Sequence, residues 1–172
     1  NGFQIDRLTI PSEVEILANQ LSGKAQINFS DEKPRVAIFV SKQSHCLVDL
    51  ILRARNIELP MDISLIISNH LELKPLCDHF GILFEYIPMG KSNKIDAENI
   101  ILSRLKHHKI ELVVLAKYMQ ILSKYFLGEF PSVINIHHSF LPAFKGAQPY
   151  ERAWQRGVKL IGATAHYVTE EL

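Results

Sequence analysis

From residue 35 onward, apolar runs of strand length alternate with amphipathic stretches of helix length, and this alternation constrains the fold more than any other feature. Arg35 to Val40 and Ile63 to Ser68 are apolar at nearly every position, which is typical of parallel strands buried on both faces. Four further strands are expected at residues 83–87, 111–116, 133–137 and 160–167. The sequence therefore predicts an α/β fold with a Rossmann-like, doubly wound and mostly parallel sheet.

Between these runs, apolar residues recur at helical spacing. The stripes that they form are Leu47, Leu50, Ile51 and Ala54, then Ile100, Ile101 and Leu105, then Tyr150, Ala153 and Trp154. Asp96 is expected to cap the second of these helices, and Gly157 is expected to end the third. In a doubly wound sheet ligands bind outside the carboxyl ends of the strands, so functional residues are sought there.

The first 30 residues follow a different pattern, which predicts a small β-α-β piece. Alternation from Phe3 to Ile10 predicts a strand, Ser12 with Glu15 predicts a capping box that begins a helix, and Ala25 to Phe29 predicts a second strand. Such a piece is too small to bury a core, so half of a domain is expected here. Residues 31–34 are charged and end in a proline, which predicts a linker.

Charge and hydropathy exclude several classes of partner. The 19 Lys and Arg residues nearly balance the 18 Asp and Glu residues, and a net charge of +1 gives no reason to expect nucleic acid or an anionic membrane surface. No apolar run reaches the roughly 18 residues that span a bilayer, and the start lacks a signal-peptide pattern. A cytoplasmic protein with a small-molecule partner is expected. The start without Met and the end directly after a predicted strand suggest an internal fragment.

The densest polar cluster is Asn135-Ile136-His137-His138-Ser139, at the end of a predicted strand. Alternation places Asn135 and His137 on the same face. A carboxamide can hold a carbonyl oxygen, and an imidazole can donate to the oxyanion that forms when water attacks, so the pair favours acyl-transfer chemistry. On spacing alone the alternative is structural, with an asparagine that closes a turn beside hydrogen-bonded histidines.

The predicted turn after the first strand, Ser41-Lys42-Gln43-Ser44-His45, contains no glycine. A nucleotide phosphate needs glycines that let backbone N–H groups approach it closely. The turn is therefore poorly suited to bind a phosphorylated molecule that would accept the acyl group, and water is favoured as the acceptor. Lys42 and His45 either shape the entrance to the site or are ordinary turn and N-cap residues.

No metal site is predicted. His137 and His138 point to opposite faces of a strand, and no carboxylate or cysteine lies near them at ligand spacing. Cys46 and Cys77 lie in two different predicted helices without a CxxC motif, so both are expected to be reduced structural thiols.

The sequence around Asn135 and His137 resembles the folate-dependent formyltransferase family. The resemblance lies in Asn135, His137 and Ser139 with Leu141-Pro142, then Gly146 and the run Gly162-Ala163-Thr164-Ala165-His166-Tyr167-Val168. Within the family, residues 41–47, 115–119 and 137–144 resemble the deformylases, which hydrolyse 10-formyltetrahydrofolate, more than the transferases. The resemblance covers residues 35–172 as a catalytic domain, and residues 1–30 resemble the C-terminal half of an ACT regulatory domain.

The resemblance implies a catalytic pair, Asn135 and His137, which an aspartate expected just after Leu172 would complete. The catalytic domain is thus expected to be truncated, and the fragment inactive. Folate binding is implied for Met119, Gln120, Ile121, Leu122, Val168, Thr169, Glu170, Glu171 and Leu172. Gln120 stands where relatives commonly have Arg, so a charge that could meet the acidic tail of the substrate is missing. Without the resemblance, the favoured interpretation is that Met119, Ile121 and Leu122 are only the core face of a short helix.

The resemblance further implies 10-formyltetrahydrofolate as substrate, formate and tetrahydrofolate as products, no metal cofactor, and a place in one-carbon and purine metabolism. It also implies a homo-oligomer with an amino-acid effector at the ACT module. Two alternatives stay open. One is transfer of the formyl group to an amine, and the other is a non-catalytic sensor that binds folate without turnover.

Overall fold

The computed structural model describes residues 6–27, 29, 31–137, 149–160 and 162–169. The chain divides into two compact units, residues 1–33 and residues 34–172, and each is considered by itself. Within the described ranges, no helix is both long and apolar enough to cross a membrane.

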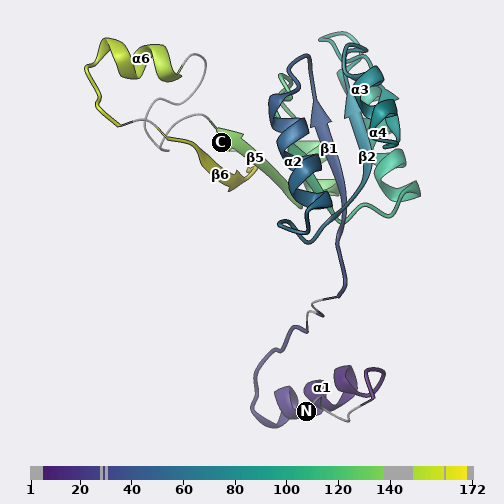
Figure 1. Cartoon of the computed structure of the whole chain (residues 1–172). Coiled ribbons are helices and arrows are strands. Elements are labelled where there is room, and N and C mark those ends of the chain that lie inside the picture. Colours follow the sequence, from purple (N-terminus) through teal and green to yellow (C-terminus); the bar gives the residue numbers. More distant parts are fainter. Residues whose placement is uncertain (1–5, 28, 30, 138–148, 161, 170–172) are drawn as a thin grey trace. The chain divides into compact units, whose positions relative to one another are not determined.

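The second unit is built on a six-stranded sheet with the order β3-β2-β1-β4-β5-β6 (Figure 1). Its strands are β1 Arg35–Val40, β2 Asp62–Ser68, β3 Phe84–Tyr86, β4 Leu112–Leu115, β5 Val133–His137 and β6 Thr164–Tyr167. Neighbouring strands run parallel except for the antiparallel pair β5–β6. The predicted doubly wound, mostly parallel sheet is therefore confirmed, and its strand order reverses between β1 and β4, where such folds bind ligands.

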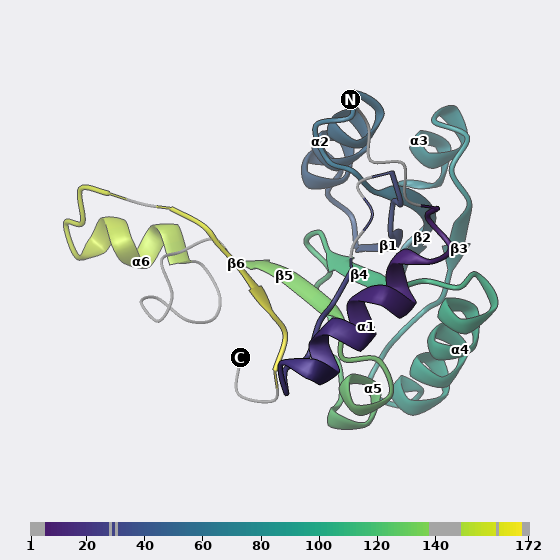
Figure 2. The same cartoon turned by 90° about the horizontal axis from the view of Figure 1, so that it is seen from below.

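Helices cover both faces of this sheet. Figure 2 shows α2 (His45–Arg55) and α3 (Lys74–His79) on one side, and α4 (Lys94–His107) and α5 (Lys124–Glu129) on the other. Alternate residues of β1 join two separate cores: Ala37 and Phe39 pack with α4 and α5, whereas Val36 and Ile38 pack with α2 and α3. Burial on both faces is the physical reason why β1 carries almost no polar residue.

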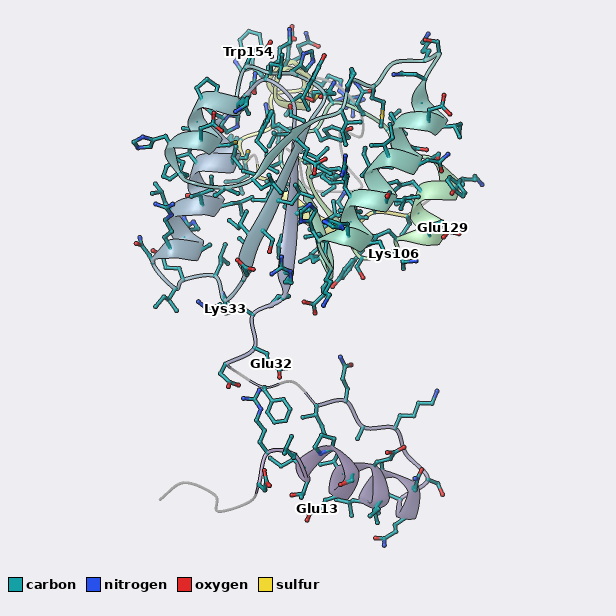
Figure 3. All side chains as sticks on the ribbon, turned by 90° about the vertical axis from the view of Figure 1, so that its right-hand side faces the viewer. Glu13, Glu32, Lys33, Lys106, Glu129 and Trp154 are labelled. Carbon is teal, nitrogen blue, oxygen red and sulfur yellow. The ribbon has the colours of Figure 1, made fainter. Side chains whose placement is uncertain are left out.

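Two predicted helix faces are only partly right. Ile101 is buried, but Ile100 is 48% exposed, because adjacent residues on a helix point about 100° apart. In α6 (Pro149–Gln155) Ala153 is buried, whereas Trp154 is 80% exposed and lies at the surface (Figure 3). Gly157, with φ of +66°, follows the end of this helix as expected.

Two predicted boundaries in this unit differ from the structure by more than one residue. The N-cap of α4 is Asn93 rather than Asp96, and the side chain of Asn93 accepts a hydrogen bond from the backbone of Gly90 in the preceding turn. Strand β6 begins at Thr164 rather than Leu160. Its partner β5 ends at His137, which pairs with Thr164, so residues before Thr164 lie beyond the end of the ladder.

The first unit contains helix α1 (Ile10–Gln20), and the strands predicted around it are wrong within the described residues. Residues 7–9 form a turn, Ile10 already belongs to the helix, and no strand is assigned among the described positions of 25–29. The predicted capping box is also wrong, because Thr9 is the N-cap and Ser12 lies inside the helix, donating to the carbonyl of Thr9 at 2.8 Å. A strand requires a neighbour for its backbone hydrogen bonds, which local alternation cannot supply.

Candidate active site

A pocket of about 370 Å³ lies beside the carboxyl end of β4, next to the core that packs against α4 and α5. Its lining consists of Leu115, Tyr118, Gln120, Ile121, Leu122, Lys124, Leu127, Asn135, Val168 and Thr169. These residues come from the last position of β4, the loop after it, α5, the middle of β5 and the segment after β6. Residues that are far apart in the sequence thus form one concave site.

Six of the residues predicted to form the site line this pocket, namely Gln120, Ile121, Leu122, Asn135, Val168 and Thr169. Met119 does not, and its side chain is 74% exposed. His137 belongs to β5, where its backbone pairs with that of Thr164, but its side chain lies outside the described part of the chain. Residues 170–172, which carry the remaining predictions, also lie outside it.

Residues 117–123, the pocket loop, lie between β4 and α5, and four of them line the candidate site. The loop begins with Lys117 in the left-handed region, at φ of 59°. It ends at Ser123, the N-cap of α5, whose hydroxyl accepts a hydrogen bond of 3.1 Å from the backbone N–H of Phe126. Because the loop is not helical and Ile121 is 85% exposed, the alternative that these residues are the core face of a helix is wrong. Of residues 119–122, Leu122 alone is buried in the core.

Tyr118 forms an aromatic wall that the sequence analysis did not single out. Its ring packs edge-on against Phe39 at 5.3 Å between centroids, and its hydroxyl lies 3.8 Å from the sulfur of Met89. Burial, and then the nearby carboxylate of Glu98, raise the pKa of the Tyr118 hydroxyl far above its usual range. Tyr118 therefore presents a neutral phenol at any physiological pH.

Leu115, Lys124 and Leu127 were also missed. Leu115 and Leu127 look like ordinary core residues in the sequence, and Lys124 looks like a surface lysine at the start of a helix. In the sequence, the only indication that they line the pocket is their position beside the pocket loop. The lining itself depends on how β4, the loop and α5 fold together.

Asn135 places a carboxamide in this mostly apolar pocket. Its backbone position is fixed on both sides, because it pairs with Leu115 of β4 and with His166 of β6. Gln120, Lys124 and Thr169 supply the other polar groups of the lining. A concave, largely apolar site with a few convergent polar groups suits a flat ring system with hydrogen-bonding edges.

Lys42 and His45 do not line the pocket. The ammonium group of Lys42 lies 3.6 Å from the carboxylate of Glu72, and His45 is the exposed first residue of α2. Cys46 and Cys77 are free thiols, as expected, and burial raises the pKa of both. Within the residues that the structure covers, His, Cys, Asp and Glu do not gather in groups of three that could hold a metal ion.

Comparison with known proteins identifies the family. The formyl transferase family matches residues 34–172. The formyltetrahydrofolate deformylase of Synechocystis sp. is 54% identical over 172 residues, which are 100% of this chain and 61% of that protein, so the chain spans about three fifths of this relative.

Two solved structures support the same family assignment. A formyltetrahydrofolate deformylase from Pseudomonas syringae pv. tomato superposes with a TM-score of 0.91 at 43% identity, covering 99% of this chain and 57% of the other. A phosphoribosylglycinamide formyltransferase from Anaplasma phagocytophilum has a TM-score of 0.71 at 33% identity, covering 82% and 67%. The expected family resemblance is confirmed, and the chain belongs to the formyl transferase family.

Proposed function

We propose that the protein hydrolyses 10-formyltetrahydrofolate to formate and tetrahydrofolate. The observation that carries this proposal is the carboxamide of Asn135 in a pocket whose other walls are mainly apolar. The names of the most similar relatives, formyltetrahydrofolate deformylases, support the same reaction. A pteridine ring would occupy the apolar part of the pocket, with its polar edges towards the pocket loop.

In the proposed reaction, the carboxamide N–H of Asn135 donates a hydrogen bond to the formyl oxygen while a water oxygen adds to the formyl carbon. The carbon–nitrogen bond then breaks, the nitrogen of tetrahydrofolate takes a proton, and formate leaves. Strand alternation predicts that His137 lies on the same face as Asn135 and donates to the developing oxyanion. Leu115, Leu122 and Val168 would surround the ring and limit the access of other water molecules.

The acceptor distinguishes this proposal from formyl transfer to an amine. The turn between β1 and α2, residues 41–44, has no glycine with which to approach a phosphorylated acceptor. Water needs no such loop, and this observation favours hydrolysis.

The test is to incubate the intact protein with 10-formyltetrahydrofolate and to measure formate and tetrahydrofolate separately. We expect equal amounts of both without any added amine. Asn135→Ala should lower kcat by about 10²- to 10³-fold, the typical effect of removing one oxyanion donor. Asn56→Ala, which changes an exposed asparagine at the end of α2, is the matched control and should leave kcat unchanged.

Three results would contradict the proposal. Equal kcat values for the Asn135→Ala variant and the unmodified protein would remove Asn135 from the mechanism. Release of tetrahydrofolate without formate, dependent on an added amine, would indicate a transferase. Folate binding in calorimetry without any turnover would indicate a sensor.

We also propose that residues 1–30 belong to an ACT-like module that binds an amino-acid effector in a cytoplasmic homo-oligomer. The support is the sequence resemblance of these residues together with helix α1. Calorimetry of the intact protein with each of the common amino acids, combined with light scattering, tests both parts. No binding to any amino acid, or a monomeric mass, would contradict this proposal.

A further inference from the structure

A buried hydroxyl anchors the beginning of the pocket loop. Ser41, the residue after β1, is 3% exposed, and its hydroxyl accepts a hydrogen bond of 3.0 Å from the backbone N–H of Met119. The same hydroxyl donates to the side-chain oxygen of Asn69, just after β2, at 2.8 Å. The hydroxyl of Ser41 thus acts as both donor and acceptor. Its two hydrogen bonds join the ends of β1 and β2 to the loop that follows β4.

A buried carboxylate anchors the other end of the loop. Glu98 of α4 is fully buried and accepts hydrogen bonds from the backbone N–H of Ser123 at 2.8 Å and from its hydroxyl at 2.5 Å. The hydroxyl of Ser123 also accepts from the backbone of Phe126, so Glu98 acts on the N-cap of α5 as well. Burying a carboxylate is costly unless it is hydrogen-bonded, and both of these bonds go to the last residue of the pocket loop.

Packing in the core fixes only part of the pocket loop. Lys117 is in the left-handed region, which is strained for a residue with a side chain, and such strain persists only where the surroundings fix the conformation. Tyr118 and Leu122 are packed in the core, whereas Met119 and Ile121 are mostly exposed. Hydrogen bonds at the two ends therefore carry much of the constraint on Gln120, Ile121 and Leu122, which line the pocket.

We propose that Ser41, with Asn69, and Glu98 are positioning residues that clamp the two ends of the pocket loop and thereby set how tightly the pocket holds the pteridine ring. Neither Ser41 nor Glu98 lines the pocket, so each acts through the loop. The inference rests on the proposed function for the identity of the ligand, but the clamp itself is testable without a ligand.

The ligand-free test is amide hydrogen exchange in the intact protein. Ser41→Ala should accelerate exchange at Met119 by about ten-fold, because the amide of Met119 loses its acceptor. Glu98→Gln should do the same at Ser123, because a neutral amide oxygen is a weaker acceptor than a carboxylate. Ser64→Ala is the control for the first variant, because the hydroxyl of Ser64 on β2 makes its hydrogen bonds to Asp62, outside the clamp. Glu85→Gln is the control for the second, because this carboxylate pairs with Arg104 of α4.

The functional test is a comparison of KM with kcat for hydrolysis of 10-formyltetrahydrofolate. Ser41→Ala and Glu98→Gln should raise KM about five-fold and change kcat less than about two-fold, because the loop grips the ring while the donor of Asn135 stays in place. The two control variants should leave KM unchanged. Ser123→Ala should resemble Glu98→Gln, and Ser123→Thr, which retains the hydroxyl, should restore the KM.

The outcomes separate this inference from the proposed function. If Ser41→Ala and Glu98→Gln leave amide exchange at Met119 and Ser123 the same as in their controls, the proposed clamp is wrong, whatever the protein hydrolyses. If KM rises equally in the controls, the effect is general destabilisation and the inference is overturned. If the unmodified protein does not hydrolyse the substrate but the exchange results are as expected, the clamp stands and the proposed function fails.

Discussion

Asn135 on β5 and His166 on β6 are paired across the antiparallel ladder. Because β6 runs opposite to β5, the chain that leaves β6 returns beside Val133, whose carbonyl accepts a hydrogen bond of 2.8 Å from the N–H of Val168. This register brings Val168 and Thr169 to the pocket that Asn135 also lines. A slip of one residue would turn each side chain of β6 to the opposite face and would break up the lining.

Val168→Ala tests this register. Val168 packs against the core and lines the pocket, so its truncation should cost about 1 kcal/mol of unfolding free energy and weaken folate binding several-fold. Tyr167→Ala is the control, since Tyr167 is 64% exposed and does not line the pocket. Urea unfolding and calorimetric Kd values provide the measurements. Equal losses of affinity in both variants would contradict the register argument.

Gln120→Arg should strengthen binding of a folate with an acidic tail. Gln120 lines the pocket without a charge, and a partly exposed ion pair contributes about 0.2–1 kcal/mol, so Kd should fall by about 1.4- to five-fold at low salt. The gain should disappear at about 1 M salt, where charges are screened within roughly 3 Å. Gln120→Met, which adds no charge, should show no dependence on salt. A gain that persists at high salt would mean that the arginine acts by another route.

Ile57→Gly should stabilise the protein. Ile57 follows the C-cap of α2 with φ of 62°, which costs a branched side chain about 1 kcal/mol or more, and glycine is the residue that favours this position. The side chain is 71% exposed, so little buried apolar area is lost. Urea unfolding should show a gain of about 1 kcal/mol. Asn56→Gly, at φ of −79°, should instead be neutral or destabilising, and a gain there would contradict the explanation.

Cys77 should make stability fall at alkaline pH. Burial raises the pKa of its thiol to about 11, above the ordinary value of 9.0, so folding favours the neutral thiol. The resulting stability is complete below pH 9 and is lost as the pH rises towards 11, by about 3 kcal/mol at most. Urea unfolding of the parent and of Cys77→Ala between pH 8 and about 10.5 should converge as pH rises, because only the parent loses this contribution. Tyr118, whose pKa is also raised, is common to both proteins and cancels in the difference.

The sequence alone determined the elements that depend on local burial. The bounds of β1 were predicted to the residue, because a strand buried on both faces is apolar at every position. The core face of α2, with Leu47 and Ile51, followed from helical spacing in the same way. Gln120, Ile121, Leu122 and Asn135, which line the pocket, were identified through the motifs in which they lie, since a motif preserves the order of residues along the chain.

The tertiary structure decided whatever depends on partners distant in the sequence. Among the described residues the strands predicted around α1 are wrong, because alternation cannot provide a neighbouring strand. Strand β6 is shorter than predicted because its partner ends at His137. The hydrogen bond between Ser41 and Met119 joins residues 78 positions apart, and no local pattern predicts this contact. Strand pairing and loop anchoring are long-range contacts, so their geometry exists only once the sheet has formed.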